Sequence, residues 1–301
     1  MPDVRIVTLR PLLGLAVGVL AVSSAAVLIR LASAPPLSVS AYRLLVASLV
    51  VVPAALWSWR QQAPLLDRRT LAEAFGASVL LALHFGCWIA SLMYTSVASS
   101  TVIVTANPLL VAVLTPLLTR DPVSLRTVVG ILVALGGMSV LGFEGGRRAA
   151  GLPLGELLAL LGALAVAGYY ISGRRLRARL PALTYVALVY PGAAALLTLA
   201  ALATGSPLAG FPAGTWGLLA LLGLGPQVIG HSLLNWSLGY LPAVLVSTAV
   251  MAEPVGASAL AAALLGEIPT SGELAGGLLI LLGVSLALKQ NTAPKASQPQ
   301  Q

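Results

Sequence analysis

The stretch from His231 to Pro254, HSLLNWSLGYLPAVLVSTAVMAEP, combines a strongly apolar character with a few polar side chains. It leads into a segment, Ala243–Leu265, in which Glu253 is the only charged residue and which is long enough to cross a bilayer as a helix. A carboxylate at that depth is costly unless it faces the interior of a helical bundle or a wet cavity. Pro254 removes a backbone donor, so the sequence predicts a kink beside this carboxylate.

An earlier stretch of the chain repeats this one. Residues Tyr94–Pro108 read YTSVASSTVIVTANP, and residues Tyr240–Pro254 read YLPAVLVSTAVMAEP. The offset is constant at 146 residues (240 − 94 and 253 − 107), so Asn107 in one copy corresponds to Glu253 in the other. An internal repeat of this size in a membrane protein points first to a transporter.

The composition is that of a membrane protein. Hydrophobic residues make up 58% of the chain and charged residues 9%, against about 25% charged in an average soluble domain. This excludes a soluble globular protein and, despite the net charge of +8, a nucleic-acid-binding protein. Cys87 is the only cysteine and the two histidines are far apart in sequence, so we expect no disulfide, no metal site and no cofactor.

Ten apolar runs are each long enough to cross about 30 Å of hydrocarbon as a helix. The first follows two arginines but exceeds the roughly 7–15 residues of a signal-peptide core, so we expect it to be retained as a span. The sequence therefore predicts an all-α polytopic membrane protein with ten transmembrane helices. In chain order the predicted spans are Pro11–Leu31, Leu37–Trp57, Leu71–Tyr94, Val97–Leu118, Leu125–Phe143, Leu152–Ser172, Ala182–Ala203, Trp216–Trp236, Ala243–Leu265 and Gly272–Leu288.

The placement of Lys and Arg predicts the orientation. With the N-terminus in the cytoplasm, thirteen of the 17 basic residues lie inside, three lie outside, and Arg43 lies within the second span. We therefore expect both termini to be cytoplasmic in a cell-membrane protein. The predicted parts are a cytoplasmic N-terminus (1–10), a first five-helix repeat (11–143), a connecting loop (144–151), a second five-helix repeat (152–288) and a disordered cytoplasmic tail (289–301).

The loop charges predict that the two repeats are inverted. Five spans per repeat is an odd number, so the second copy enters the membrane the other way up and corresponding loops exchange their charge. Arg30 alone marks the first-to-second turn, whereas four arginines crowd the corresponding sixth-to-seventh turn. This reversal indicates an inverted repeat. Small residues in the two closing spans give each a thin face for close helix packing: Gly130, Gly137, Gly276 and Gly283.

Polar side chains within the spans are the candidate site residues. Gln227, His231 and Asn235 are spaced i, i+4, i+8 and so line one face of the eighth span, and His84 shares a face of the third span with Trp88. The remaining polar candidates are Arg43, Asn107 and Glu253, and the aromatic candidates for contact with an organic solute are Trp88, Tyr94, Trp236 and Tyr240.

Each polar candidate also has a structural alternative. The two histidines either line a transport path or are hydrogen-bonded packing residues, and Asn107 fits interhelical hydrogen bonding better than ligand binding. Arg43 lies near the outer end of its helix, where its alternative is to snorkel to the interface. For Glu253 we favour a functional role and an inward direction, because most of its nearest neighbours on the helix are Ala or Gly.

One catalytic pattern needs to be weighed. His231-x-x-x-Asn235 and Gly256-x-Ser258 resemble parts of rhomboid-type intramembrane serine proteases. That chemistry needs a histidine beside the serine to accept its proton. In the rhomboid arrangement this histidine follows the serine, and no histidine follows Ser258. We therefore do not expect an enzyme.

Taken together, these features resemble the EamA-type transporters of the drug/metabolite transporter superfamily. Support comes from Asn107-Pro108, Glu253-Pro254, Leu265-Gly266-Glu267 and Tyr42-Arg43, and the resemblance covers about residues 10–288. It implies a ten-helix secondary transporter with a central cavity between its halves, often an exporter of amino acids or small metabolites. The first half departs from the family pattern at Arg120-Asp121-Pro122, where a Gly-Glu-Arg-like turn is common, and at Asn107, which replaces the acid.

The sequence therefore favours a plasma-membrane exporter that works by alternating access on a small-molecule substrate. The third, fourth, eighth and ninth spans would line a site at the midplane of the bilayer, and Glu253 makes protons a candidate coupling ion. Two alternatives stay open. One is an anionic-metabolite exchanger, although the small number of basic residues within the spans argues against it. The other is a non-transporting scaffold or lipid-binding protein. The sequence leaves the oligomeric state open.

Overall fold

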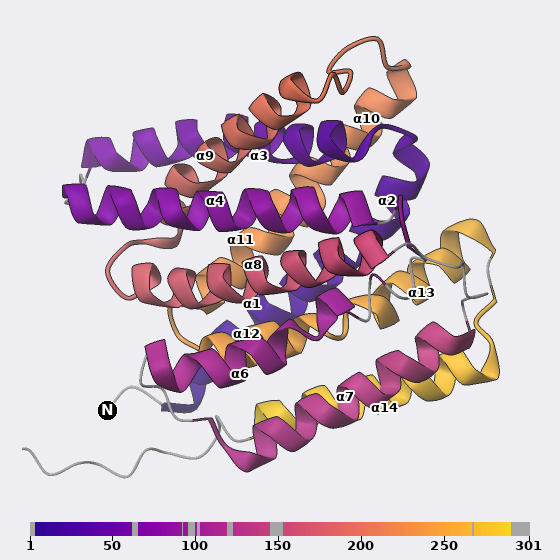
Figure 1. The fold of residues 1–301 in the computed structure, drawn as a ribbon. Helices are drawn as coiled ribbons and strands as arrows, with labels where there is room; N and C mark the ends of the chain where they lie inside the picture. The colour runs from indigo at the N-terminus through magenta and orange to yellow at the C-terminus, as the bar shows by residue number, and fades with distance from the viewer. Residues whose placement is uncertain are drawn as a thin grey trace, which may run out of the picture.

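The computed structural model describes residues 4–61, 66–91, 93–95, 100, 103–118, 123–144, 153–266 and 268–289, and these contain helices and no strand (Figure 1). Within this part of the chain the predicted all-α fold is confirmed. The helices are α1 (Val4–Ser23), α2 (Ala25–Ala32), α3 (Pro36–Gln61), α4 (Arg68–Ser91), α6 (Asn107–Leu118), α7 (Leu125–Glu144), α8 (Pro153–Arg177), α9 (Ala182–Ala203), α10 (Ala213–Leu222), η1 (Gly223–His231), α11 (Ser232–Ser237), α12 (Ala243–Val250), α13 (Glu253–Leu265) and α14 (Ser271–Leu288).

Eight segments among the described residues are long and apolar enough to cross a membrane. They coincide with eight of the ten predicted spans. Two shorter apolar helices, Ile103–Leu118 and Leu125–Val140, lie where the fourth and fifth spans are predicted. The turn 120–122, residues 145–151 of the predicted connecting loop and residues 290–301 of the predicted tail lie outside the described residues.

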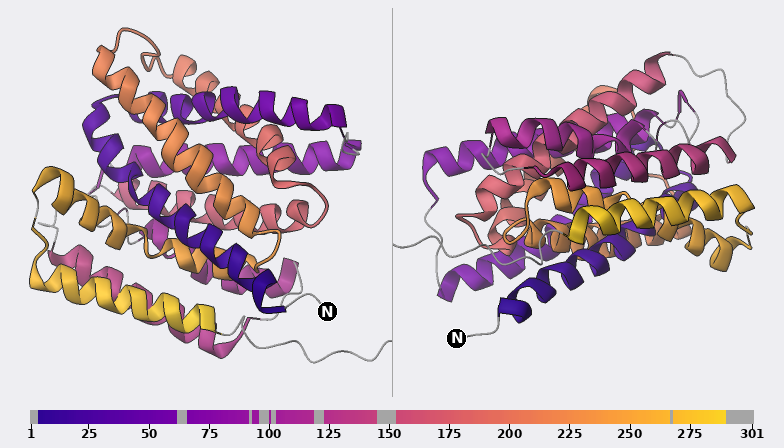
Figure 2. Two further views of the ribbon diagram at one scale, coloured as in Figure 1. Left: turned by 180° about the vertical axis from the view of Figure 1, so that it is seen from behind. Right: turned by 90° about the horizontal axis from the view of Figure 1, so that it is seen from below.

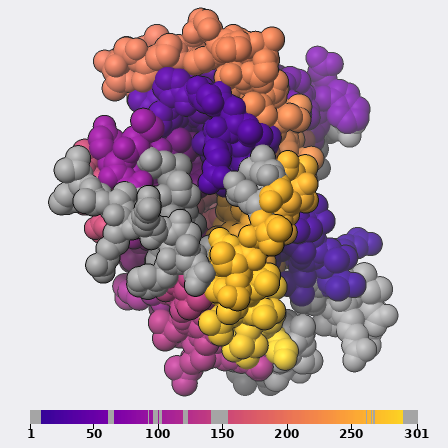
Figure 3. Space-filling view, turned by 90° about the vertical axis from the view of Figure 1, so that its right-hand side faces the viewer, coloured from indigo at the N-terminus to yellow at the C-terminus, as the bar shows by residue number. Residues whose placement is uncertain are grey.

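The two halves of the chain do not form two separate bundles, because helices of one half pack directly against helices of the other. Helix α3 of the first half contacts α9 of the second, α4 contacts α8 and α9, and α1 contacts η1 and α11. Figure 3 looks at the end of the bundle on the right of Figure 1, where indigo segments of the first half lie against orange and yellow segments of the second. The buried core accordingly takes residues from both halves.

Helices α7 and α14, which close the two halves, form the most extensive pair (Figure 2). A Cβ atom at Gly130 would lie 2.5 Å from the Gly283 carbonyl oxygen, and one at Gly283 would lie 2.4 Å from the Gly130 carbonyl oxygen. A Cβ at Gly137 would lie 2.5 Å from the carbonyl oxygen of Gly276. The predicted thin faces are confirmed. Because residue numbers increase along α7 while those of its contacts on α14 decrease, the two helices are antiparallel.

The helix break predicted beside Glu253 is present. Helix α12 ends at Val250, residues Met251 and Ala252 form a turn, and α13 begins at Glu253. Pro254 cannot donate the amide hydrogen that a continuous helix would direct to the carbonyl of Val250. In the first half the corresponding break falls at Ala106, and α6 begins at Asn107. The two equivalent polar residues therefore occupy the same position, the first residue after a break.

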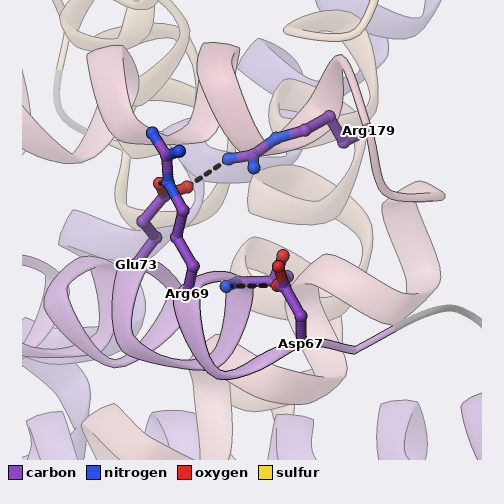
Figure 4. A network of polar contacts seen from close by, with 5 residues as sticks. Asp67, Arg69, Glu73 and Arg179 are labelled. Atoms are coloured by element: carbon purple, nitrogen blue, oxygen red, sulfur yellow. Dashed lines mark hydrogen bonds and ion pairs between the residues drawn. The ribbon is translucent and has the colours of Figure 1, made fainter.

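A polar network ties the start of α4 to the turn between α8 and α9 (Figure 4). Glu73 accepts hydrogen bonds from Arg69, with Nε to Oε1 at 3.0 Å, and from Arg179 of the turn. Asp67 caps α4 by accepting from the Thr70 amide at 2.8 Å. Hydrogen bonding from Thr70 lowers the pKa of Asp67, so this cap is present above the ordinary carboxyl range and weakens as pH falls through it.

Candidate functional site

Arg43 on α3 lies at the centre of a buried polar cluster. Its side chain is 1% exposed, its Nε donates to Gln227 Oε1 at 2.7 Å, and its guanidinium carbon lies 4.3 Å from the centroid of the Phe85 ring. The snorkelling alternative for Arg43 is therefore wrong. A buried guanidinium is costly without partners, and here an amide oxygen and an aromatic face compensate it in part.

Gln227 reaches Arg43 because its helix is widened and lies close to α3. It sits in η1, a π-helical segment that contains Pro226, a residue with no amide hydrogen for regular α-helical bonding. A Cβ atom at Gly223 would lie 2.5 Å from Val46 Cβ and 3.1 Å from the Arg43 carbonyl oxygen. Glycine at this position allows η1 to touch α3 beside Arg43.

The two histidines lie near the same aromatic ring but differ in their partners. The His231 ring meets Phe85 edge-on at a centroid distance of 5.5 Å. The His84 ring stacks on Trp88 at 5.8 Å, and its Nδ1 lies 3.0 Å from the Gly162 carbonyl oxygen on α8. Because a carbonyl only accepts, His84 Nδ1 carries the hydrogen. His84 therefore joins α4 to α8, as its structural alternative predicts.

Asn235 connects the cluster to buried tyrosines that the sequence analysis missed. Its Nδ2 donates to the hydroxyl of Tyr169 at 2.7 Å and to that of Tyr190 at 3.3 Å, and the Tyr190 hydroxyl lies 3.3 Å from Ser232 Oγ. Tyr170 and Tyr185 are equally buried. The available signal was that four of the seven tyrosines fall in the sixth and seventh spans, where each hydroxyl needs a polar partner.

Glu253 approaches this cluster from the first turn of α13. The carboxyl group is half-buried and lies within electrostatic range of Arg43 and of Tyr170. One turn along α13, a Cβ at Gly256 would meet Ser23 Oγ of α1 at 2.3 Å, so the small-residue face beside Glu253 packs on protein. The cluster thus draws side chains from α3 and α4 of the first half and from α8, α9, η1, α11 and α13 of the second.

The same arrangement of two halves is found in known proteins. The model of the EamA-like transporter family matches residues 9–143 and again residues 153–289. The chain belongs to the EamA-like transporter family. This confirms the predicted family resemblance, and the protein is a multi-pass membrane transporter that works in lipid on a small-molecule substrate.

Two further likenesses agree with this assignment. The chain is 27% identical to the uncharacterized transporter YyaM of Bacillus subtilis (strain 168) over 216 residues, which is 70% of each chain. A solved crystal structure, described only as that of a protein, matches 94% of this chain and 99% of its own with a TM-score of 0.76 at 21% identity. The second likeness shows the fold alone.

The remaining candidates of this EamA-family transporter contact residues outside the cluster around Arg43. Asn107 is buried, and its Nδ2 donates to the Val104 carbonyl at 2.9 Å within its own segment. Tyr94 and Tyr240 are 44% and 52% exposed, and Trp236 packs on the Tyr240 ring at 4.9 Å and against Gly14 of α1. Among the described residues, no hydrogen bond or ring contact joins these four to Arg43.

Several buried polar atoms of the EamA-family transporter lack a hydrogen-bond partner within the described part of the chain. They are Arg43 Nη1, Gln227 Nε2, His231 Nδ1, Trp88 Nε1, Asn107 Oδ1 and Asn235 Oδ1. Buried polar atoms are usually paired with protein or with ordered water, so each exception calls for an explanation such as a bound water or a ligand. No group of three or more His, Cys, Asp or Glu suited to a metal ion occurs among the described residues.

Proposed function

We propose that this protein is a secondary transporter that exports small organic metabolites, amino acids or related compounds, across the cell membrane by alternating access. The observation that carries the proposal is the buried cluster around Arg43, which combines both signs of charge with unpartnered donors between the two halves of the chain. Polar sites between repeats near the bilayer midplane are typical of secondary transporters.

We further propose ten transmembrane helices arranged as two inverted repeats, residues 11–143 and 152–288, with both termini in the cytoplasm. The antiparallel contact of α7 and α14 supports this arrangement, because equivalent helices of two inverted copies run in opposite directions. The excess of Lys and Arg on one set of loops supports the orientation.

Alternating access requires that each end of the bundle open in turn. At the end where α4 begins, arginines from the end of α8 donate to carbonyls of neighbouring segments: Arg174 to Leu238 at 3.0 Å, Arg177 to Asn235 at 3.0 Å, and Arg175 to Leu118. Arg179 of the following turn is paired with Glu73 (Figure 4). In the proposed cycle these contacts hold this end closed and separate when the solute passes it.

Glu253 is proposed as the residue that couples the cycle. It begins a helix directly after a break, which gives it a place on a segment able to move, and it lies within electrostatic range of Arg43. A carboxyl group there can exchange a proton or bind an ammonium group of the solute. A scaffold or lipid-binding protein would have no need for a buried cluster of charged and unpartnered groups.

The test is solute efflux from reconstituted vesicles, after a screen by export-dependent growth tolerance has found a transported compound. Wild type, Glu253→Gln and the control Glu156→Gln, which changes an exposed carboxylate on α8, are compared over about pH 5.5–8.5, a range that covers imidazole titration and lies above the titration of ordinary exposed carboxyl groups. We expect Glu253→Gln to lose flux, or to retain exchange without pH dependence, while remaining monodisperse. Glu156→Gln should behave as wild type.

Two outcomes would contradict these proposals separately. Equal flux and an equal pH profile in wild type and Glu253→Gln would remove Glu253 from the mechanism but leave transport intact. Failure of correctly folded wild type to move any compound found by the screen would favour the scaffold or lipid-binding alternative.

A further inference from the structure

Arg43 has donor capacity that the described residues do not use. A guanidinium offers five N–H donors in a fixed planar fork. The Nε–H is taken by Gln227 at 2.7 Å, whereas Nη1 is buried and meets no acceptor in the described part of the chain. A buried charged donor left unpaired costs more than a neutral one, so this position calls for an acceptor that the described residues do not supply.

Two neighbours of Arg43 also have buried polar nitrogens that make no regular hydrogen bond among the described residues. Because Gln227 accepts through Oε1, its amide Nε2 is the atom left over; it is buried and lies beside the Tyr190 hydroxyl without a hydrogen bond of regular geometry. The His231 ring lies on the same Phe85 ring that carries the guanidinium, and His231 Nδ1 also lacks a partner. Three side chains that converge on one place therefore have hydrogen-bonding nitrogens to spare.

The guanidinium is also held in a defined orientation. The Phe85 face lies 4.3 Å from its central carbon and Gln227 fixes Nε, so the plane of the fork is set from two sides. A preset fork loses less entropy when it binds a planar, two-oxygen group. This is the geometry that favours bidentate pairing with a carboxylate.

We infer that Arg43 is the anchor for a carboxylate group of the transported solute, oriented for this task by Gln227 and Phe85. The inference rests on the proposed transport function and concerns the same site. A carboxylate brings one negative charge to the single guanidinium, so it meets less repulsion from the nearby Glu253 than a dianionic phosphate would. Arg43 thereby favours a solute that carries a carboxylate over the corresponding carboxamide.

A structural role for Arg43 makes a different prediction. If the side chain served only to pin η1 to α3 through Gln227, its loss would destabilise the protein without changing which solutes bind. An anchor for a carboxylate instead determines the preference between an acid and its carboxamide, which have nearly the same size and differ in charge.

The experiment uses amino acids paired with their carboxamides as probes, with thermal stabilisation of purified protein and flux in vesicles as readouts. Wild type should be stabilised by at least one acid, and the matching amide should bind about 10- to 100-fold more weakly, the range for losing a charged hydrogen bond. Arg43→Gln should lose this preference. Arg43→Lys keeps the positive charge but loses the planar guanidinium, so it should show a weaker preference for the acid over the amide. Arg126→Gln, which changes an exposed residue on α7, should show the same preference as wild type.

The outcomes separate this inference from the proposed function. Transport of acid and amide with equal efficiency by wild type overturns the carboxylate anchor while leaving transport established, and this comparison needs no variant to fold. An acid preference that survives in folded Arg43→Gln also overturns it. Absence of flux for every solute contradicts the transport function itself.

Discussion

Replacing Gly137 by alanine should weaken the contact between α7 and α14 by a predictable amount. The added Cβ would lie 2.5 Å from the Gly276 carbonyl oxygen and 2.7 Å from the Ile280 amide nitrogen. Ordinary contact distances are about 3.5–4.0 Å, and both obstacles are backbone atoms that cannot rotate away. The two helices therefore have to separate by about 1 Å, and overpacking of this kind costs about 1–3 kcal/mol.

The neighbouring glycine provides a matched control. Gly136 lies on the same helix, and a Cβ atom added there would meet nothing within 4 Å. Gly136→Ala should thus cause no clash and should remove the helix penalty of glycine, about 0.5–1 kcal/mol. The same gain applies to Gly137→Ala, so the free energies of unfolding of the two variants should differ by the cost of the clash alone, about 1–3 kcal/mol, in favour of Gly136→Ala.

The measurement is unfolding of purified protein in mixed micelles with a rising fraction of denaturing detergent, followed by tryptophan fluorescence. Gly283→Ala, whose Cβ would lie 2.4 Å from the Gly130 carbonyl oxygen, should behave like Gly137→Ala. Equal midpoints for Gly136→Ala and Gly137→Ala would refute the reasoning, because they would show that the glycine face does not set the distance between these helices.

The remaining predictions concern orientation and His231. On a Cys87→Ala background, Ala209→Cys in the turn between α9 and α10 should react with an impermeant thiol reagent outside intact cells, and Ala178→Cys after α8 should not. The reverse pattern would overturn the orientation. His231→Ala should impair flux while yield and thermal behaviour in detergent stay near those of wild type, because His231 Nδ1 has no partner among the described residues. A large loss of stability with unchanged specific flux would assign His231 to packing instead.

Much of the fold could be predicted from the chain alone, because its determinants are local. Apolar runs of about 20 residues have to be helical in lipid, where each backbone polar group needs an internal partner. The break before Glu253 follows from the chemistry of Pro254, and the close approach of α7 and α14 follows from glycines that recur at one spacing in both repeats. The repeat itself also identified the transporter class before any contact was known.

The site was predictable only as a set of residue types. The i, i+4, i+8 spacing selected Gln227, His231 and Asn235, and all three are buried. The partners across the bundle were not predictable: Arg43 pairs with Gln227 at a separation of 184 residues, and Asn235 bonds Tyr169 at a separation of 66. These pairs depend on which helices pack together and on the π-helical widening of η1.

The physical reason is that lipid is as apolar as the protein interior, so hydropathy does not show which face of a transmembrane helix is buried against protein. In water, a helix shows its buried side by apolar periodicity. In a bilayer the lipid-facing and protein-facing sides are both apolar, so hydropathy could not tell that Arg43 points inward rather than to the interface. For the same reason it could not show that Tyr94 and Tyr240 are about half exposed while Tyr169 and Tyr190 are buried. Helix packing, which joins residues far apart in the chain, sets those directions.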